Sequence, residues 1–210
     1  MARVGLLGGT FNPPHVGHLV CADCAREELG LDVVRLVVAG SPPHKEVEWD
    51  PGADVRAELA RLAAAGEPAL EVSLVELSRP GPSYTVDTLR ALHAEAPGDE
   101  LTFIVGGDMA LSFPRWREPG GILALARLGV ALRAADREAV RSSVAAVGAE
   151  ALERLDLFEM PRIDVSSSLV RERVAAGRSI RYLVPDAVRE RIERLGLYRG
   201  GARVGEAAWV

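Results

Sequence analysis

The chain has 210 residues, of which 48% are hydrophobic and 26% charged, a composition that is typical of a globular protein and excludes a disordered or fibrous chain. No apolar run approaches the ~20 residues that cross a bilayer, and the first residues lack the features of a signal peptide, so we expect a cytoplasmic protein with no membrane partner. The formal net charge of −5 argues against a nucleic-acid partner, which usually needs a basic face.

Strand-like and helix-like segments alternate along the chain. Apolar runs and periodicity predict, in chain order, a strand at 4–7, a helix from near 16, a strand at 33–39, a helix at 53–65, a strand at 70–77, a helix at 84–96, a strand at 101–105, a short helix at 122–126, a strand at 128–132, a helix at 137–150, a strand at 155–160, and helices at 166–176 and 186–195. This alternation predicts a Rossmann-like, doubly wound α/β fold with a parallel sheet of about six strands and closing C-terminal helices. We expect a single domain over 1–199 and a flexible tail over 200–210, in which Trp209 could dock.

Ligands of doubly wound sheets bind at the carboxyl ends of the strands, where the strand order reverses. The chemically notable segments all fall in the loops at that edge. They are GGTFNPPH after the first strand, SPPHK after the second, PGPSYT after the third, GGD after the fourth and the serine run after the sixth. The predicted sheet therefore places its binding site among these five loops.

The segment from Gly8 to Leu19 has the arrangement of a phosphate-binding turn. Gly8 and Gly9 let the backbone turn sharply and approach a ligand, and the free N–H groups and dipole of the following helix attract an anion. His15 and His18 are three residues apart, so both can point from the start of the helix towards that anion. The alternative is a plain strand-to-helix loop with one capping and one buried histidine.

Other candidate residues each have an ordinary structural alternative. Lys45, beside His44 on a proline-rich loop, could neutralise phosphate charge or simply be solvated. Asp108 follows two glycines at a strand end and could accept a ribose hydroxyl, contact a water on Mg²⁺ or cap a helix. The segment VSSSLVRER could bind phosphate at its helix start through Ser167, Ser168 and Arg171, or supply an ordinary N-cap.

Cys21 and Cys24 form a C-x-x-C motif within the first predicted helix. Structural zinc needs four ligands, and no second Cys/His pair lies at a suitable spacing. We therefore expect buried thiols that pack in the core, with a redox role as the alternative.

Gly9, Phe11, Pro13, His15, Gly17 and His18 match the G-x-F-x-P-x-H-x-G-H signature, and residues 165–171 resemble the I-S-S-T-x-I-R motif. Both motifs are typical of the nucleotidyltransferase superfamily, which the chain resembles. The resemblance implies catalytic roles for His15, His18, Lys45 and Arg171. It also implies that ATP is bound by Gly8, Gly9, Thr10, Phe11, His15, His18, Gly106, Asp108, Ser167, Ser168 and Arg171.

PSYTVDTL at 82–89, GGDM, and PRWRE at 114–118 are similar to segments of the bacterial nicotinate-nucleotide adenylyltransferases. By this resemblance Thr85 and nearby N–H groups receive the pyridine carboxylate, and Trp116 stacks on the pyridine ring; without it, Trp116 would be an exposed loop aromatic. The implied pyridine-nucleotide site comprises Thr10, Asn12, His44, Lys45, Tyr84, Thr85, Asp108 and Trp116. Asn12 stands where many relatives carry Asp, which disfavours metal binding at that position.

The resemblance implies that nicotinate mononucleotide attacks ATP to form nicotinate adenine dinucleotide and pyrophosphate, with Mg²⁺ held by the substrate phosphates and no protein metal site. A homo-oligomer is possible. The alternatives are another small-molecule nucleotidyltransferase such as phosphopantetheine adenylyltransferase, a non-catalytic nucleotide-binding protein on the same fold, and a redox protein that uses Cys21 and Cys24.

Overall fold

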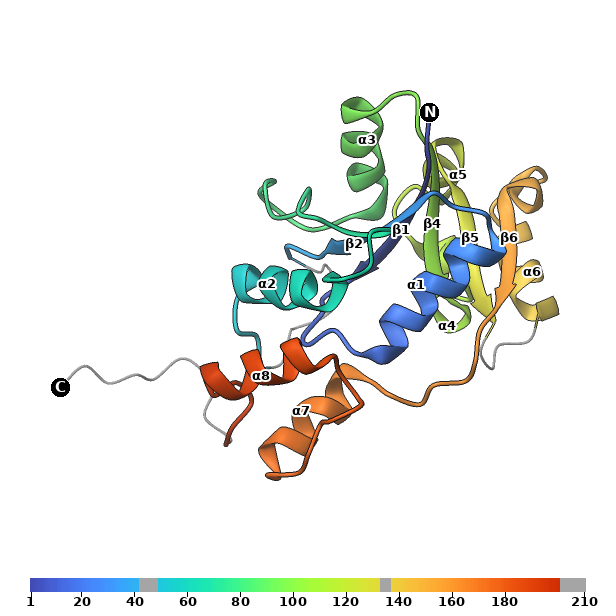
Figure 1. The fold of residues 1–210 in the computed structure, drawn as a ribbon. Coiled ribbons are helices and arrows are strands. Elements are labelled where there is room, and N and C mark those ends of the chain that lie inside the picture. The colour runs from blue at the N-terminus through green and yellow to red at the C-terminus, as the bar shows by residue number, and fades with distance from the viewer. Residues whose placement is uncertain (42–48, 133–136, 201–210) are drawn as a thin grey trace.

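A computed structural model describes residues 1–41, 49–132 and 137–200 of the chain. Their strands form one six-stranded sheet in the order β3-β2-β1-β4-β5-β6, and all neighbouring pairs are parallel. The strand bounds are β1 (Arg3–Gly9), β2 (Val33–Val38), β3 (Leu70–Ser73), β4 (Glu100–Gly106), β5 (Arg127–Leu132) and β6 (Leu155–Glu159). The predicted doubly wound parallel sheet is confirmed, and the order reverses between β1 and β4 (Figure 1).

Helices cover both faces of the sheet (Figure 1). The α-helices are α1 (Val16–Glu28), α2 (Ala53–Ala64), α3 (Thr85–Glu95), α4 (Gly107–Ala110), α5 (Pro119–Leu125), α6 (Arg137–Ala145), α7 (Ser167–Ala175) and α8 (Asp186–Leu195), with short 3₁₀ turns η1 (Phe113–Arg115) and η2 (Ala151–Arg154). One apolar cluster joins α3, α5 and α6 to the sheet, and a second joins α1 and α2 to its other face. A third cluster packs α7 and α8 against α2, so the closing helices sit beside the edge where β1 and β2 end.

Successive residues of the central strands enter opposite clusters because side chains alternate along a strand. On β4, Phe103 and Val105 face the first cluster, whereas Ile104 faces the second. Burial on both faces explains why the central strands are almost continuously apolar. Each large aliphatic side chain that is removed from water contributes about 1.5–3 kcal/mol, so this sheet is a rigid base for the loops at its edge.

Four predicted elements have wrong bounds. Strand β1 continues to Gly9 rather than ending at 7, so the sharp turn predicted at Gly8 and Gly9 is wrong: both glycines still pair with β2. Strand β3 ends at Ser73 rather than 77, because the chain turns back at Leu74, whose carbonyl accepts the N–H of Leu77 at 2.9 Å. Helix α6 ends at Ala145 rather than 150, where a turn leads to Gly148 and η2. Helix α5 begins at Pro119, a residue that suits a first helical position, rather than at 122.

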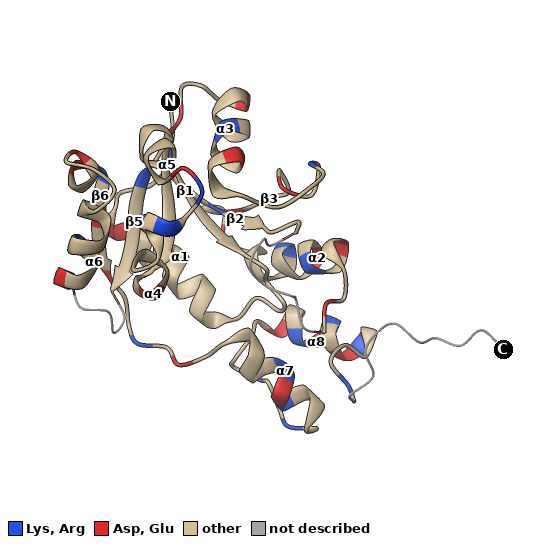
Figure 2. Cartoon of the chain, turned by 180° about the vertical axis from the view of Figure 1, so that it is seen from behind, with Lys and Arg blue, Asp and Glu red and all other residues tan. Residues whose placement is uncertain are grey.

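Residues of both charge signs occur along α2, α3, α7 and α8 (Figure 2). The sheet interior is formed by apolar residues. No helix within the described ranges is long and apolar enough to span a membrane. Beyond Gly200, the tail predicted to be flexible lies outside the described residues, as does Trp209.

Candidate functional site

A cleft of about 320 Å³ opens at the carboxyl edge of the sheet, beside the point where β1 and β4 adjoin. Its wall is formed by residues from β1, α1, β2, the segment before α3, β4 and the η1 region. The lining residues are Leu7, Gly8, Gly9, His15, Gly17, His18, Cys21, Val37, Ala39, Glu76, Ser83, Thr85, Phe103, Ile104, Val105, Gly106, Met109 and Trp116. The expected position of the site, at the switch point of the sheet, agrees with this cleft.

His15 and His18 lie together at the start of α1. His15 is the N-cap residue and is 8% exposed, and its ring centroid lies 3.8 Å from that of His18. The Nδ1 atom of His18 accepts a hydrogen bond from the His15 main-chain N–H at 3.2 Å. In a neutral imidazole this assignment leaves the proton on Nε2 of His18, which makes that atom a donor. Phe11 supports the pair, with its ring edge-on to His18 at 5.0 Å.

Gly17 provides the space that the His15 ring needs. A Cβ atom at Gly17 would lie 3.0 Å from Nδ1 and 3.1 Å from Cε1 of His15. The glycine of the His-x-Gly-His pattern is therefore explained by the space that the His15 ring occupies.

One N–H group that was expected to be free at this helix start is engaged, because Val16 donates to the carbonyl of Leu183 at 3.0 Å.

Gly8 and Gly9 bring the backbone of β1 to the cleft wall. A Cβ atom at Gly9 would lie 3.0 Å from Cζ of Phe11, whose own φ of 49° turns the chain beneath the strand end. Phe11 is 1% exposed and Thr10 is half-buried, and neither is among the lining residues. Both shape the loop, and their contact with ATP stays a prediction.

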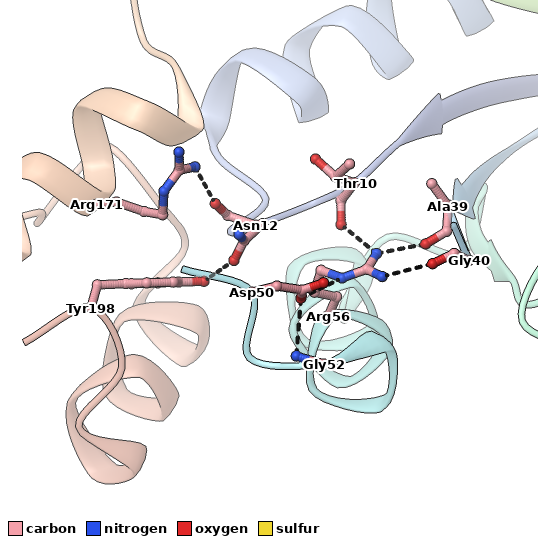
Figure 3. A network of polar contacts seen from close by, with 9 residues as sticks. All are labelled: Thr10, Asn12, Ala39, Gly40, Asp50, Gly52, Arg56, Arg171 and Tyr198. Atoms are coloured by element: carbon pink, nitrogen blue, oxygen red, sulfur yellow. Dashed lines mark hydrogen bonds and ion pairs between the residues drawn. The ribbon is translucent and has the colours of Figure 1, made fainter. Parts of the chain in front are cut away.

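Asn12 is buried behind the loop rather than in the cleft wall (Figure 3). Its Oδ1 atom accepts a hydrogen bond from the Tyr198 hydroxyl at 2.6 Å, and its carbonyl oxygen accepts one from Nη1 of Arg171 at 2.9 Å. Burial raises the pKa of the Tyr198 phenol, so this hydroxyl stays protonated and can donate. The predicted contact of Asn12 with the pyridine nucleotide remains untested.

The three serines at the start of α7 have different contacts. Ser166 caps the helix by accepting the N–H of Leu169 at 3.1 Å, and Ser167 donates to the Pro13 carbonyl at 2.8 Å. The Ser168 hydroxyl accepts a hydrogen bond from Arg171 at 3.2 Å. Ser167 and Arg171 therefore reach the loop between β1 and α1, whereas Ser168 contacts Arg171. None of the three lines the cleft, and their contact with ATP stays a prediction.

Only some of the residues predicted to bind the pyridine nucleotide line the cleft. Thr85, the first residue of α3, and Trp116 both line it. Trp116 packs edge-on against Phe103 and Phe113 at 6.0 and 5.5 Å, and its indole N–H donates to Ser112 at 3.0 Å. These contacts fix the indole before any ligand arrives.

Tyr84 and Asp108, which were also assigned to substrates, do not line the cleft. Tyr84 packs against the core beneath the guanidinium of Arg117, at 4.6 Å from the ring centroid. Asp108 is exposed on α4, next to Gly106 of the cleft wall. His44 and Lys45 lie outside the described residues.

Sequence reasoning missed three residues beside the cleft: Arg56, Glu76 and Ser83. Arg56 is 1% exposed within α2, in a stretch that matches no motif. Helical spacing could have identified it, because Arg56 lies three residues before Leu59 and four before Ala60. Both of these are buried, so Arg56 falls on the buried face of the helix. Glu76 and Ser83 belong to the connection between β3 and α3 and line the cleft.

The expectation of buried cysteines is only partly correct. Cys21 and Cys24 form no disulfide with each other and are half-buried against the second apolar cluster, and Cys21 lines the cleft. Burial, followed by the charge of Asp23, raises the pKa of the Cys24 thiol, which keeps it in the less reactive protonated form.

Comparisons with known proteins agree with one another. A family profile described as cytidylyltransferase-like matches residues 6–173. A protein of Roseiflexus sp. named "probable nicotinate-nucleotide adenylyltransferase" is 46% identical over 201 residues, which cover 94% of this chain and 98% of that protein. One of Thermus thermophilus with the same name is 44% identical over 203 residues and covers 94% of this chain and 100% of that protein.

A solved structure resembles the fold over almost its whole length. The nicotinic acid mononucleotide adenylyltransferase of Plasmodium falciparum, determined in complex with NaAD, has a TM-score of 0.76 and 15% sequence identity. The match covers 94% of this chain and 98% of that one. At this identity the likeness concerns the fold alone.

Proposed function

The chain belongs to the nicotinate-nucleotide adenylyltransferases within the cytidylyltransferase-like family, and from this membership we propose how its cleft performs the reaction. The enzyme joins ATP and nicotinate mononucleotide to give nicotinate adenine dinucleotide and pyrophosphate, a step of NAD biosynthesis. No feature favours phosphopantetheine as the substrate, or a protein that only binds nucleotides.

In the reaction, an oxygen of the 5′-phosphate of nicotinate mononucleotide forms a bond to the α-phosphorus of ATP. The bond from that phosphorus to the bridging oxygen breaks, and pyrophosphate leaves with the electron pair. The attacking phosphate is already an anion at neutral pH, so the step needs no general base. The protein's task is to align two like-charged phosphates and to stabilise the negative charge on the leaving group.

The paired imidazoles at the start of α1 carry this proposal. His15 and His18 stand 3.8 Å apart beside Gly8 and Gly9, at the positive end of a helix and in the wall of the cleft. We propose that they bind the ATP phosphates and act in catalysis with Arg171 and Lys45. The other proposed ATP contacts are Gly8, Gly9, Thr10, Phe11, Gly106, Asp108, Ser167 and Ser168.

The proposed pyridine-nucleotide contacts are Thr10, Asn12, His44, Lys45, Tyr84, Thr85, Asp108 and Trp116. Thr85 supports this assignment because it begins α3 within the cleft, where N–H groups at a helix start favour a carboxylate. Trp116 supports it because its indole offers a flat surface in the same wall.

We expect pyrophosphate release from ATP and Mg²⁺ to be about a hundredfold faster, in kcat/KM, with nicotinate mononucleotide than with nicotinamide mononucleotide. The amide lacks the charge that the N–H groups near Thr85 would bind, and a lost charge-assisted hydrogen bond costs about 1.5–3 kcal/mol. Steady-state assays with both nucleotides measure the ratio. Equal rates with the two nucleotides would support the proposed reaction but contradict a carboxylate-binding site near Thr85. No pyrophosphate release with either nucleotide would contradict the reaction itself.

Replacing Trp116 with alanine is expected to raise the KM for nicotinate mononucleotide about tenfold while the KM for ATP changes less than about twofold, because a stacking surface contributes about 1–3 kcal/mol. Titration of each substrate at saturation with the other gives both constants. Trp49 is a matched control, since its side chain is 41% exposed and does not line the cleft. An unchanged KM for the pyridine nucleotide in Trp116→Ala would exclude stacking.

We propose that Mg²⁺ enters as its complex with ATP, held by the phosphates. Within 1–41, 49–132 and 137–200, no group of three or more His, Cys, Asp or Glu side chains is placed to hold a metal ion. We also propose that residues 1–199 form one catalytic domain and that the protein acts in the cytoplasm without nucleic-acid or membrane partners. Formation of a homo-oligomer is compatible with this proposal. Cysteines that form no disulfide, as Cys21 and Cys24 here, are typical of a reducing compartment.

A further inference from the structure

Arg56 is a buried cation on α2 whose guanidinium spans the ends of two strands (Figure 3). Its side chain is 1% exposed. Nη1 donates to the carbonyl oxygens of Thr10 at 3.1 Å and Ala39 at 2.6 Å, and Nη2 donates to that of Gly40 at 3.3 Å. Nε donates to Oδ1 of Asp50 at 3.0 Å, which pairs the charge.

The three carbonyl groups belong to segments that approach the cleft. Thr10 directly follows β1, whose last residue, Gly9, lines the cleft. Ala39 and Gly40 follow β2, and Ala39 also lines it. The Ala39 N–H donates to the Gly9 carbonyl at 2.9 Å, so the segments that follow β1 and β2 stay in register at the edge of the sheet. Arg56 holds that register through the carbonyl oxygens of both segments.

The connection between β3 and α3 is tied to the same point. The Ser83 hydroxyl oxygen accepts the N–H groups of Gly40 and Ser41, both at 3.1 Å. A Cβ atom on Gly40 would lie 2.6 Å from the carbonyl oxygen of Glu76, so the two backbones are in direct contact there. Because Glu76, Ser83 and Thr85 line the cleft, a shift at Gly40 reaches the predicted pyridine side as well.

Arginine suits this role because of its geometry. Its planar guanidinium offers five N–H donors in a rigid fork, which can address several carbonyls and a carboxylate at once. Lysine offers a compact ammonium that cannot reproduce that fork. Arg56 is not among the residues that line the cleft, so it acts through the loops rather than on the substrate.

We propose that Arg56 is a positioning residue for adenylyl transfer, which holds the loops after β1 and β2 at the spacing that aligns the two phosphates. The proposal rests on the function proposed above. Alignment of reacting groups is sensitive to displacements of about 1 Å, which can lower the rate about a hundredfold. Loss of the fork is therefore expected to lower kcat more than it weakens substrate binding.

The test compares pyrophosphate release by wild type and Arg56→Lys at saturating ATP and nicotinate mononucleotide. We expect kcat to fall about thirtyfold while both KM values stay within about threefold. In Arg56→Ala, millimolar guanidinium ion is expected to restore kcat about fivefold, because it can occupy the vacated fork site. If Arg56→Ala does not fold, Asp50→Asn replaces it with an expected kcat loss of about fivefold, since it removes only the charge partner.

Arg191 provides a matched control on the other side of α2. It donates to Glu58 of that helix at 2.9 Å, whereas Arg56 donates to carbonyls at the strand ends, so Arg191→Lys perturbs α2 at a different point. We expect Arg191→Lys to keep kcat within about twofold and Arg191→Ala to show no rescue by guanidinium. A folded Arg56→Lys variant with wild-type kcat, or a loss matched by Arg191→Lys, would overturn the positioning role. Inactivity of the wild type would instead contradict the proposed function.

Discussion

Replacing His18 with alanine is expected to lower kcat for pyrophosphate release about a thousandfold, because a preorganised donor to developing negative charge contributes about 10²–10³ in rate. The hydrogen bond from the His15 N–H to Nδ1 of His18 holds the ring in advance, and in a neutral imidazole it leaves the proton on Nε2. The loss in stability is expected to be about 1 kcal/mol, the contribution of a single hydrogen bond at a half-buried position. Steady-state kinetics and thermal unfolding of the same preparation measure the two effects.

His93 is the matched control for this substitution, since it is exposed in the last turn of α3. We expect His93→Ala to retain wild-type kcat and a wild-type melting temperature. His18→Gln should recover part of the activity, because an amide also donates a hydrogen bond. Wild-type turnover in His18→Ala would remove the core of the proposed mechanism.

Arg171→Ala is expected to lower kcat/KM for ATP about a hundredfold, since hydrogen bonds to a charged group contribute about 1.5–3 kcal/mol each. The same change removes the donor to the carbonyl of Asn12 within the loop that carries the histidines. Because Arg171 is 7% exposed and that carbonyl is left without this donor, we also expect a loss in the free energy of unfolding of about 1–3 kcal/mol. Kinetics at 20 °C, well below the melting transition, separate the two effects.

Arg173, two residues further along α7, gives the comparison that this prediction needs. Its Nε donates to the carbonyl of Ser179 at 2.8 Å, so Arg173→Ala also removes a contact from an arginine to a backbone carbonyl. We expect it to lower the melting temperature slightly and to leave kcat/KM for ATP within about twofold. Equal catalytic losses in both variants would mean that Arg171 only stabilises α7.

The local part of the site could be predicted because its geometry is encoded by neighbouring residues. The end of β1, the helix that begins at Val16, and the adjacent His15 and His18 lie within one short segment, where strand and helical spacing determine the arrangement. Placement of Thr85 at the start of α3 follows in the same way from the break at Pro80 to Pro82.

Other features depend on contacts between distant parts of the chain. Arg56 reaches Thr10 across 46 residues, and Tyr198 reaches Asn12 across 186. Neither residue belongs to a motif, and helical spacing places Arg56 on the buried face of α2 without identifying its partners. The end of β3 at Ser73 was missed for a related reason, because Leu74, Val75 and Leu77 pack on the apolar clusters within a turn rather than by continued pairing with β2.

The sequence by itself determined the alternation of strands and helices, the doubly wound class of sheet, and the histidine turn at the start of α1, because each depends on periodicity or on adjacent residues. Only the tertiary structure decided the strand order, and with it the adjacency of β1 and β4 that opens the cleft. The tertiary structure alone also decided that three distant side chains donate hydrogen bonds to the loop after β1, namely those of Arg56, Arg171 and Tyr198. The physical reason is that burial and hydrogen bonding across the fold select these partners, whereas local propensity acts over a few residues.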